Sequence, residues 1–80
     1  MFYVYIIRSE SRSEQTYVGF TTDLKQRLAK HNAGGSPHTA KFAPWRLEFY
    51  CAFQREEKAL AFERYLKSHS GKAFANKRLL

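Results

Sequence analysis

The sequence predicts an α+β fold in which two strands, a helix, a third strand and a second helix follow one another, with a short helix at the C-terminal end. Apolar residues alternate or run unbroken over segments of strand length, and elsewhere they recur every three or four positions, as along one face of a helix. Segments rich in Gly, Pro, Ser and Asn separate these elements and are typical of turns. The 80 residues are expected to form one domain, residues 1–80.

The first predicted strand, Phe2 to Ile7, is apolar on both alternating faces, which is typical of a strand covered on both sides. The polar segment Ser9 to Gln15 is predicted to be a hairpin loop, so that a second strand, from about Thr16 to Phe20, pairs antiparallel with the first. This pairing would bring Tyr5 and Tyr17 into the same neighbourhood. The two faces of the first strand carry Tyr3, Tyr5 and Ile7 on one side and Phe2, Val4 and Ile6 on the other.

A helix is predicted to follow the second strand, in which Gly19 lets another group approach the backbone closely. On this helix Leu24 and Leu28 share one face, and Arg27 and His31 border the same apolar stripe. A cation and an imidazole thus lie near the buried face, beside a strand that carries a tyrosine. The simpler interpretation is an arginine that reaches solvent and a partly buried histidine. The helix is expected to begin after a cap at Thr21, Thr22 or Asp23 and to end at Asn32 or Gly34.

The segment from this helix to Trp45 is predicted to be a long loop, and loops of more than ~12 residues are usually functional or mobile. Its cations Lys41 and Arg46 are placed to lie along a phosphate backbone, and a mobile connection is the alternative. A third strand is predicted from Arg46 to Phe53, because apolar and polar residues alternate there. One face would carry Leu47, Phe49, Cys51 and Phe53, and the other Arg46, Glu48 and Tyr50.

The second long helix is predicted from about Glu56 to Ser68, with Gly71 past its end. Glu63 falls inside the apolar stripe of this helix. A carboxylate that faces a core must be paired, protonated or bound to a metal, because burying it alone is costly. A structural ion pair, for example with Arg27, and a metal-binding or acid–base role both meet this requirement. The stripe consists of Ala59, Phe62 and Leu66.

The chain is strongly basic, with a formal net charge of +7 from 14 basic and 7 acidic residues. This excess favours a polyanionic partner, nucleic acid first and an anionic membrane surface second, although a basic soluble protein without either has the same composition. One cysteine excludes an internal disulfide, and no apolar run approaches the ~20 residues that span a bilayer, so a soluble cytoplasmic protein is expected. A short helix with a basic side is predicted in the segment Lys72 to Leu80, which contains Lys72, Asn76, Lys77 and Arg78.

Two tyrosine motifs now stand in a recognisable order. Tyr3-Val4-Tyr5 and Tyr17-Val18-Gly19, followed by Arg27 and then Glu63, resemble the motifs of the GIY-YIG nuclease family. The resemblance covers essentially the whole chain, and it is greatest to the small, single-domain, uncharacterised bacterial members of the family. The segments that resemble this subgroup in particular are Ala59 to Lys67 and His38 to Pro44.

The resemblance implies a three-stranded antiparallel sheet flanked by helices, in a domain that cleaves DNA phosphodiesters with one divalent ion, Mg2+ or Mn2+. Glu63 matches the metal-binding glutamate of the family. The other residues that match catalytic positions of the family are Tyr5, Tyr17, Arg27 and His31, and Asn76 is a more loosely spaced match to an asparagine of some members.

These residue types suit phosphodiester hydrolysis. Arg27 can hold a phosphate and neutralise developing charge, and an ion on Glu63 can act as a Lewis acid. Tyr5, Tyr17 and His31 are all candidates for the base that takes a proton from water. An ordinary phenol titrates near ~10, so a tyrosine base needs positive charge nearby.

The sequence therefore predicts a metal-dependent DNA endonuclease or nickase that acts alone or with a protein partner supplying specificity. Two departures from the family favour the main alternative, a module that binds DNA or RNA without cutting it: Phe20 stands where many members have a cation, and the 80 residues include no separate DNA-recognition domain. Tyr3 also replaces the glycine that opens the first motif. A protein-interaction domain is a third reading, and membrane binding is not expected. The residues expected to contact nucleic acid are Lys41, Arg46, Lys72, Lys77 and Arg78.

Overall fold

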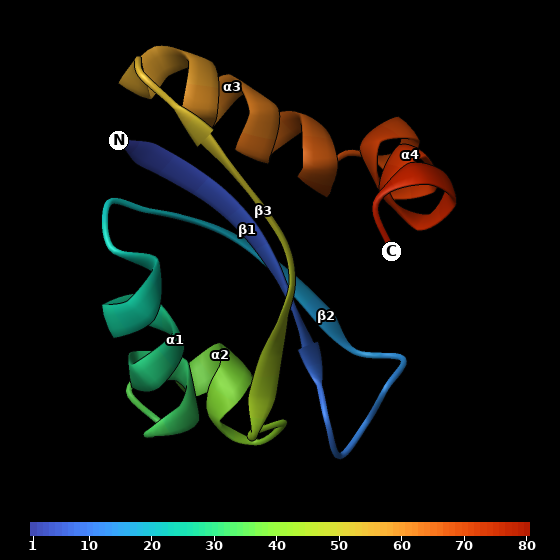
Figure 1. Ribbon diagram of the computed structural model, residues 1–80. Coiled ribbons are helices and arrows are strands. Elements are labelled where there is room, and N and C mark those ends of the chain that lie inside the picture. Colours follow the sequence, from blue (N-terminus) through green and yellow to red (C-terminus); the bar gives the residue numbers. More distant parts are fainter.

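Three strands form one antiparallel sheet in the order β2-β1-β3, with helices on both faces, as Figure 1 shows for the computed structural model, which describes residues 1–80. The predicted α+β fold is confirmed, and one short helix is added between the first helix and the third strand. No helix is long and apolar enough to cross a bilayer. In chain order the elements are β1 (Phe2–Ser9), β2 (Thr16–Thr21), α1 (Leu24–Asn32), α2 (Pro37–Ala40), β3 (Trp45–Phe53), α3 (Glu56–Lys67) and α4 (His69–Arg78).

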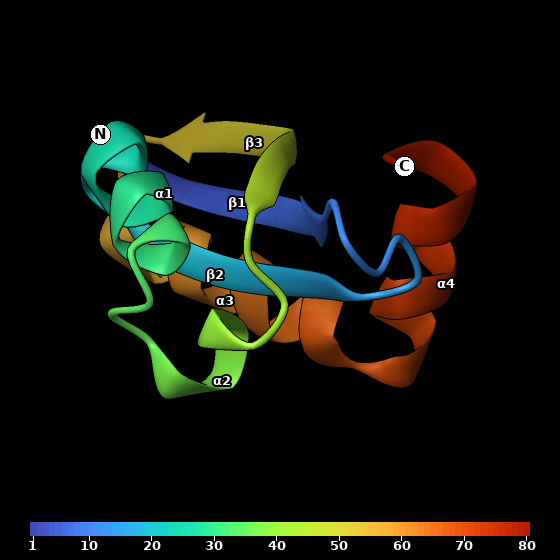
Figure 2. The same cartoon turned by 90° about the horizontal axis from the view of Figure 1, so that it is seen from below.

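The central strand β1 is covered from both sides, as its sequence predicts. Val4 and Ile6 pack in one buried cluster with residues of α3 and α4, whereas Tyr5 and Ile7 pack in a second cluster with Trp45. Leu24 and Leu28 of α1 lie against this second cluster, which confirms the predicted apolar face of the helix. Figure 2 shows the two layers, with α1 and α2 in front of the strands and α3 behind them.

The predicted alternation of the third strand is wrong at Leu47. Ile6 pairs with Phe49 but Ile7 pairs with Leu47, so the register shifts and Glu48 is an extra residue in β3. The shift moves Leu47 to the opposite face from Phe49 and leaves it 38% exposed. The Glu48 carboxylate then binds two cations at 3.0 Å each, Arg8 and Arg46.

The segment between α1 and β3 is held in place by side-chain hydrogen bonds. Asn32 brackets Trp45, because its amide N–H donates to the Trp45 carbonyl at 3.1 Å and its amide oxygen accepts from the Trp45 backbone N–H at 2.5 Å. The Trp45 indole N–H donates to the Thr39 carbonyl at 2.8 Å, and the Ser9 hydroxyl donates to the Phe42 carbonyl at 2.6 Å. The long connection is thus tied to both α1 and β1.

The helix boundaries differ from the prediction at the C-terminal end. Asp23 caps α1 by accepting from the Gln26 N–H, as one of the three expected caps. The last helix begins at His69 rather than Lys72, so Gly71 lies past the end of α3, as predicted, but inside α4. A Cβ atom at Gly71 would overlap the Tyr65 carbonyl oxygen. Glycine here therefore lets α4 turn directly off the end of α3, a tertiary requirement that local sequence does not reveal.

Candidate functional site

Two tyrosines and a histidine meet on the α1 face of the sheet. The hydroxyl oxygen of Tyr5 lies 2.9 Å from Nε2 of His31, which belongs to the last turn of α1. The Tyr17 ring, from β2, has its centroid 6.5 Å from that of Tyr5 and meets the His31 ring edge-on at 5.2 Å. The predicted neighbourhood of Tyr5 and Tyr17 is confirmed, and His31 completes it.

Gly19 makes room for this arrangement. It lies directly opposite Tyr5 in the β1–β2 register. A Cβ atom at Gly19 would overlap the phenol oxygen and ring of Tyr5, so only a residue without a side chain lets the ring lie flat against the backbone of β2. The close approach that the glycine predicts is therefore made by Tyr5.

Arg27 lies one helical turn before His31 and is half-buried beside Tyr5. Its guanidinium donates through Nη1 to the Phe20 carbonyl at 3.2 Å, which ties α1 to the end of β2. Burial raises the pKa of the Tyr5 phenol, and hydrogen bonding and positive charge from Arg27 oppose that rise. Tyr5 is consequently a protonated phenol in contact with a permanent cation.

His31 is held by hydrogen bonds on both ring nitrogens. Nε2 faces Tyr5, and Nδ1 lies 2.7 Å from the hydroxyl oxygen of Thr39 in α2. Burial lowers the pKa of His31, and the charges of Arg27 and Lys30 lower it further. The imidazole is 2% exposed and neutral at pH 7.

Glu63 lies at the border of its helix face, with its side chain 21% exposed. Its Oε2 atom is 3.1 Å from Nζ of Lys67, one turn later on α3. The ion pair expected as one alternative therefore forms with Lys67 and not with Arg27. Lys67 also lies over the Tyr17 ring, with Nζ 5.9 Å from the ring centroid, and so connects Glu63 to the tyrosine cluster.

Two residues of this arrangement were not identified as site residues from sequence. The signal for Lys67 was its position four residues after Glu63, the spacing at which helical ion pairs form. Thr39 was one polar residue among several in a predicted loop. Its burial depends on α2 and on the Trp45 contact, which no local pattern indicates.

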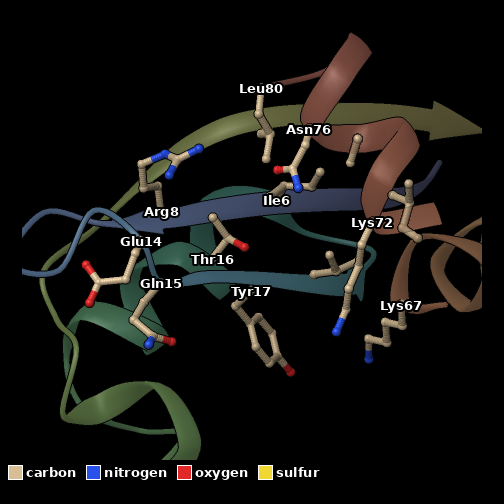
Figure 3. Close-up of a pocket in the computed structure, with 13 residues that line it drawn as sticks. Ile6, Arg8, Glu14, Gln15, Thr16, Tyr17, Lys67, Lys72, Asn76 and Leu80 are labelled. Atoms are coloured by element: carbon tan, nitrogen blue, oxygen red, sulfur yellow. The ribbon is translucent and has the colours of Figure 1, made fainter. Parts of the chain in front are cut away.

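A groove of about 560 Å³ lies beside Tyr17, between the β1–β2 hairpin and α4. Figure 3 shows Lys72 and Asn76 of α4 projecting toward the strands, with Lys67 and Tyr17 below them. The floor is apolar and includes Ile6 and Leu66, which are each 1% exposed. The groove thus combines an apolar floor with the cations Arg8, Lys67 and Lys72, and Tyr17 of the site lines it as well.

The remaining predicted nucleic-acid contacts do not line the groove. Arg46 shares the Glu48 carboxylate with Arg8, a residue that lines the groove. Lys41 follows α2, and its Nζ atom lies 5.3 Å from the centroid of the Phe42 ring. Lys77 and Arg78 are exposed in the last turn of α4 and do not line the groove. Of the five cations predicted to contact nucleic acid, Lys72 alone lines the groove.

Comparison with known proteins identifies relatives over nearly the whole chain. The model of the GIY-YIG catalytic domain family matches residues 1–78. UPF0213 proteins of Streptococcus pyogenes serotypes M5 and M2 are each 41% identical over 66 residues, which cover 81% of this chain and 70% of the relative. The solution NMR structure of a UPF0213 protein from Bacillus halodurans superposes with a TM-score of 0.57 at 32% identity, covering 99% of this chain and 87% of that one.

Proposed function

This chain belongs to the GIY-YIG family, and on that premise we propose that it is a divalent-metal-dependent endonuclease or nickase that hydrolyses phosphodiester bonds in DNA. The observation that carries the proposal is a convergence of residues that lie far apart in the sequence. Tyr5 and His31 share a hydrogen bond at 2.9 Å, and Tyr17 packs against both rings. Arg27 and the Glu63–Lys67 pair adjoin this cluster from two helices.

The surroundings of the three candidate bases favour Tyr17. Both ring nitrogens of His31 already have hydrogen-bond partners, and burial raises the pKa of the Tyr5 phenol. Tyr17 is more exposed than either and lines the groove beside Lys67, whose Nζ lies 5.9 Å from the Tyr17 ring centroid. We therefore propose that Tyr17 acts as the phenolate, takes one proton from the attacking water and becomes a phenol, with Tyr5 and His31 as the buried support of the site.

Arg27 is the residue best suited to hold the phosphate. Its planar guanidinium matches two phosphate oxygens, and its Nη1 atom is anchored to the Phe20 carbonyl. A cation in this position stabilises the charge that accumulates on the phosphate during hydrolysis. Arg27 is thus expected to contribute more to the rate than to folding.

The residues fit a single divalent ion. Glu63 offers one partly exposed carboxylate, and Mg2+ often keeps several waters and binds through one or two carboxylates together with substrate phosphates. The chain contains no group of three or more His, Cys, Asp or Glu side chains that could hold an ion, so Glu63 would act with water and substrate phosphate as the other ligands. We propose that Glu63 holds Mg2+ or Mn2+, which supplies Lewis-acid stabilisation to the phosphate and the leaving oxygen when bound.

The test is nicking of supercoiled plasmid by the purified protein with Mg2+, with Mn2+ and with EDTA. Arg27→Ala, purified in the same way, measures contaminating nuclease. We expect open-circular product only with wild-type protein and a metal. Cutting that survives EDTA, or that is equal in the variant, contradicts the proposal.

The Glu63–Lys67 ion pair is the observation that favours the second candidate, a nucleic-acid-binding module without activity. A carboxylate already neutralised by a lysine has less attraction for a metal. Salt-sensitive binding of a labelled duplex or RNA, without any cutting in Mg2+ or Mn2+, would select this alternative. Cutting that requires an added protein would instead indicate a partner that supplies specificity.

A further inference from the structure

Thr39 lies in a fixed place at the end of a buried line of polar groups. Its side chain is 1% exposed, and its carbonyl accepts the indole N–H of Trp45 at 2.8 Å. Its hydroxyl oxygen lies 2.7 Å from Nδ1 of His31, whose Nε2 lies 2.9 Å from the Tyr5 hydroxyl. Every buried side-chain nitrogen and oxygen in the chain has a hydrogen-bond partner, so the direction of each bond in this line can be derived by elimination.

The direction of the first bond follows from the neighbours of the Tyr5 hydroxyl, of which only Nε2 of His31 can accept a proton. A guanidinium has N–H donors and no acceptor, so the Tyr5 hydroxyl cannot donate toward it. Nε2 of His31 is the acceptor that lies within hydrogen-bond distance of Tyr5. The Tyr5 O–H therefore donates to His31, and Nε2 carries a lone pair rather than a proton.

The second bond follows from the first. His31 is neutral, because burial and two neighbouring cations lower its pKa, and a neutral imidazole has one N–H. That proton is on Nδ1 and is donated to the Thr39 hydroxyl oxygen. The Thr39 hydroxyl in turn points its own proton toward the Ser36 carbonyl, 3.4 Å away.

We propose that Thr39 is a positioning residue that fixes His31 as the Nδ1–H tautomer and, through it, directs the Tyr5 hydroxyl proton into the core. The phenol oxygen then presents its lone pairs to Arg27 and holds the guanidinium beside the site. In the opposite tautomer His31 would donate to Tyr5, and the Tyr5 proton would have to turn toward Arg27 and repel it. The tautomer assignment is independent of the proposed nuclease activity, and only its effect on cleavage rests on that proposal.

The direct test is the protonation of the ring nitrogens, measured by long-range 1H–15N correlation NMR on protein with 15N-labelled histidine. We expect His31 of the wild type to carry its proton on Nδ1, unlike the exposed His38 and His69, which serve as references that average both tautomers. Thr39→Ser should keep the tautomer. Thr39→Val, which removes the acceptor, should move the proton to Nε2 or produce a mixture. A wild-type proton on Nε2, or an unchanged tautomer in a folded Thr39→Val, overturns the proposal.

Plasmid nicking supplies the functional readout. Thr39→Val should cut about 10- to 100-fold more slowly than wild type with unchanged DNA binding, and Thr39→Ser should be close to wild type. If Thr39→Val does not fold, the wild-type spectrum and the Thr39→Ser spectrum still decide the tautomer. If the wild type does not nick, the nuclease proposal fails and the NMR result stands by itself.

Discussion

The two faces of the sheet differ in how they hold their polar and charged side chains. On the α1 face, polar side chains are buried and each has a defined partner, as in the line from Tyr5 through His31 to Thr39. On the α3 face the core is apolar, and the charged groups Glu63 and Lys67 lie at its border, with side chains 21% and 50% exposed. Buried bonds keep a fixed geometry, whereas partly exposed ion pairs contribute only about 0–1 kcal/mol and exchange partners readily. The first face therefore orients groups, and the second supplies charges that can turn to a metal or a phosphate.

The largest expected effect is on the α1 face of the sheet, where filling the space beside Tyr5 should lower the stability of the fold. Gly19→Ala places a methyl group into the Tyr5 ring, and we expect a loss of about 3 kcal/mol in the free energy of unfolding together with loss of cutting. Urea denaturation measures the change. Gly35→Ala is the comparison, because its Cβ would lie 2.8 Å from Lys30 Cγ and 3.3 Å from the Lys30 carbonyl oxygen, a milder overlap than the one with the Tyr5 oxygen at Gly19. Equal stability of the two variants would mean that Tyr5 does not require the glycine.

Arg27→Ala tests whether the oriented face holds a phosphate. We expect cutting to fall by about 100-fold or more, because a cation at the developing charge is lost, while the melting temperature stays within a few degrees. Nicking and thermal melting on one preparation give both values. Lys25→Ala, exposed on the same helix, should resemble wild type. A variant that fails to fold would assign Arg27 to structure through its bond to the Phe20 carbonyl.

Glu63→Gln tests the α3 face, where the partly exposed Glu63–Lys67 ion pair lies. Its present partner is an exposed lysine, so the free energy of unfolding should change by less than about 1 kcal/mol. Metal-dependent cutting should vanish and salt-sensitive DNA binding should persist. Glu57→Gln on the same helix, whose ion pair with Arg55 is exposed, should cut normally. Cutting that survives in Glu63→Gln would remove the metal assignment.

The pH dependence of stability tests the burial of His31 on the α1 face and needs no substrate. Burial lowers the pKa of His31, so the unfolded chain binds this proton more readily than the folded one. The free energy of unfolding should therefore fall as pH drops below ~6.5, by at most about 1.4 kcal/mol per pH unit. Urea denaturation between pH 5 and 7 measures the slope. The slope should disappear in His31→Asn and remain in His38→Asn, which changes an exposed residue.

The smallest expected effect concerns Lys67. If this side chain exchanges Glu63 for a phosphate, Lys67→Met should lower the slope of log affinity against log salt by about 1. Lys58→Met, exposed near the other end of α3, is the control. Duplex titrations at several salt concentrations give both slopes, and identical slopes would place Lys67 outside the DNA contact.

Much of this arrangement could be predicted from sequence because it depends on local periodicity. Alternation in β1 gave its two buried faces, and four-residue spacing placed Arg27 and His31 beside the apolar stripe of α1. The features that were missed depend on tertiary contacts. The extra residue at Glu48 follows from pairing with β1, and the burial of Thr39 follows from packing under Trp45.

The partner of Glu63 shows the same limit. Its helix position indicated that a carboxylate near a core needs a counter-charge, but several cations satisfied that requirement. The spacing to Lys67 is local, but the exclusion of Arg27 depends on the placement of α1 and α3 on opposite faces of the sheet, which no local pattern contains. The roles of the site residues in cleavage remain predictions.

The burial of Tyr5 in the central strand has a consequence for how this domain can change over evolution. Tyr5 is 2% exposed and fills the space over Gly19, so its loss would damage the fold whatever its part in the proposed reaction. Arg27 and Glu63 stand at the rim, where replacement disturbs the fold far less. Family members that stay folded but do not cleave DNA should therefore differ first at the positions of Arg27 or Glu63. They should keep a tyrosine at the position of Tyr5, because the fold still requires it.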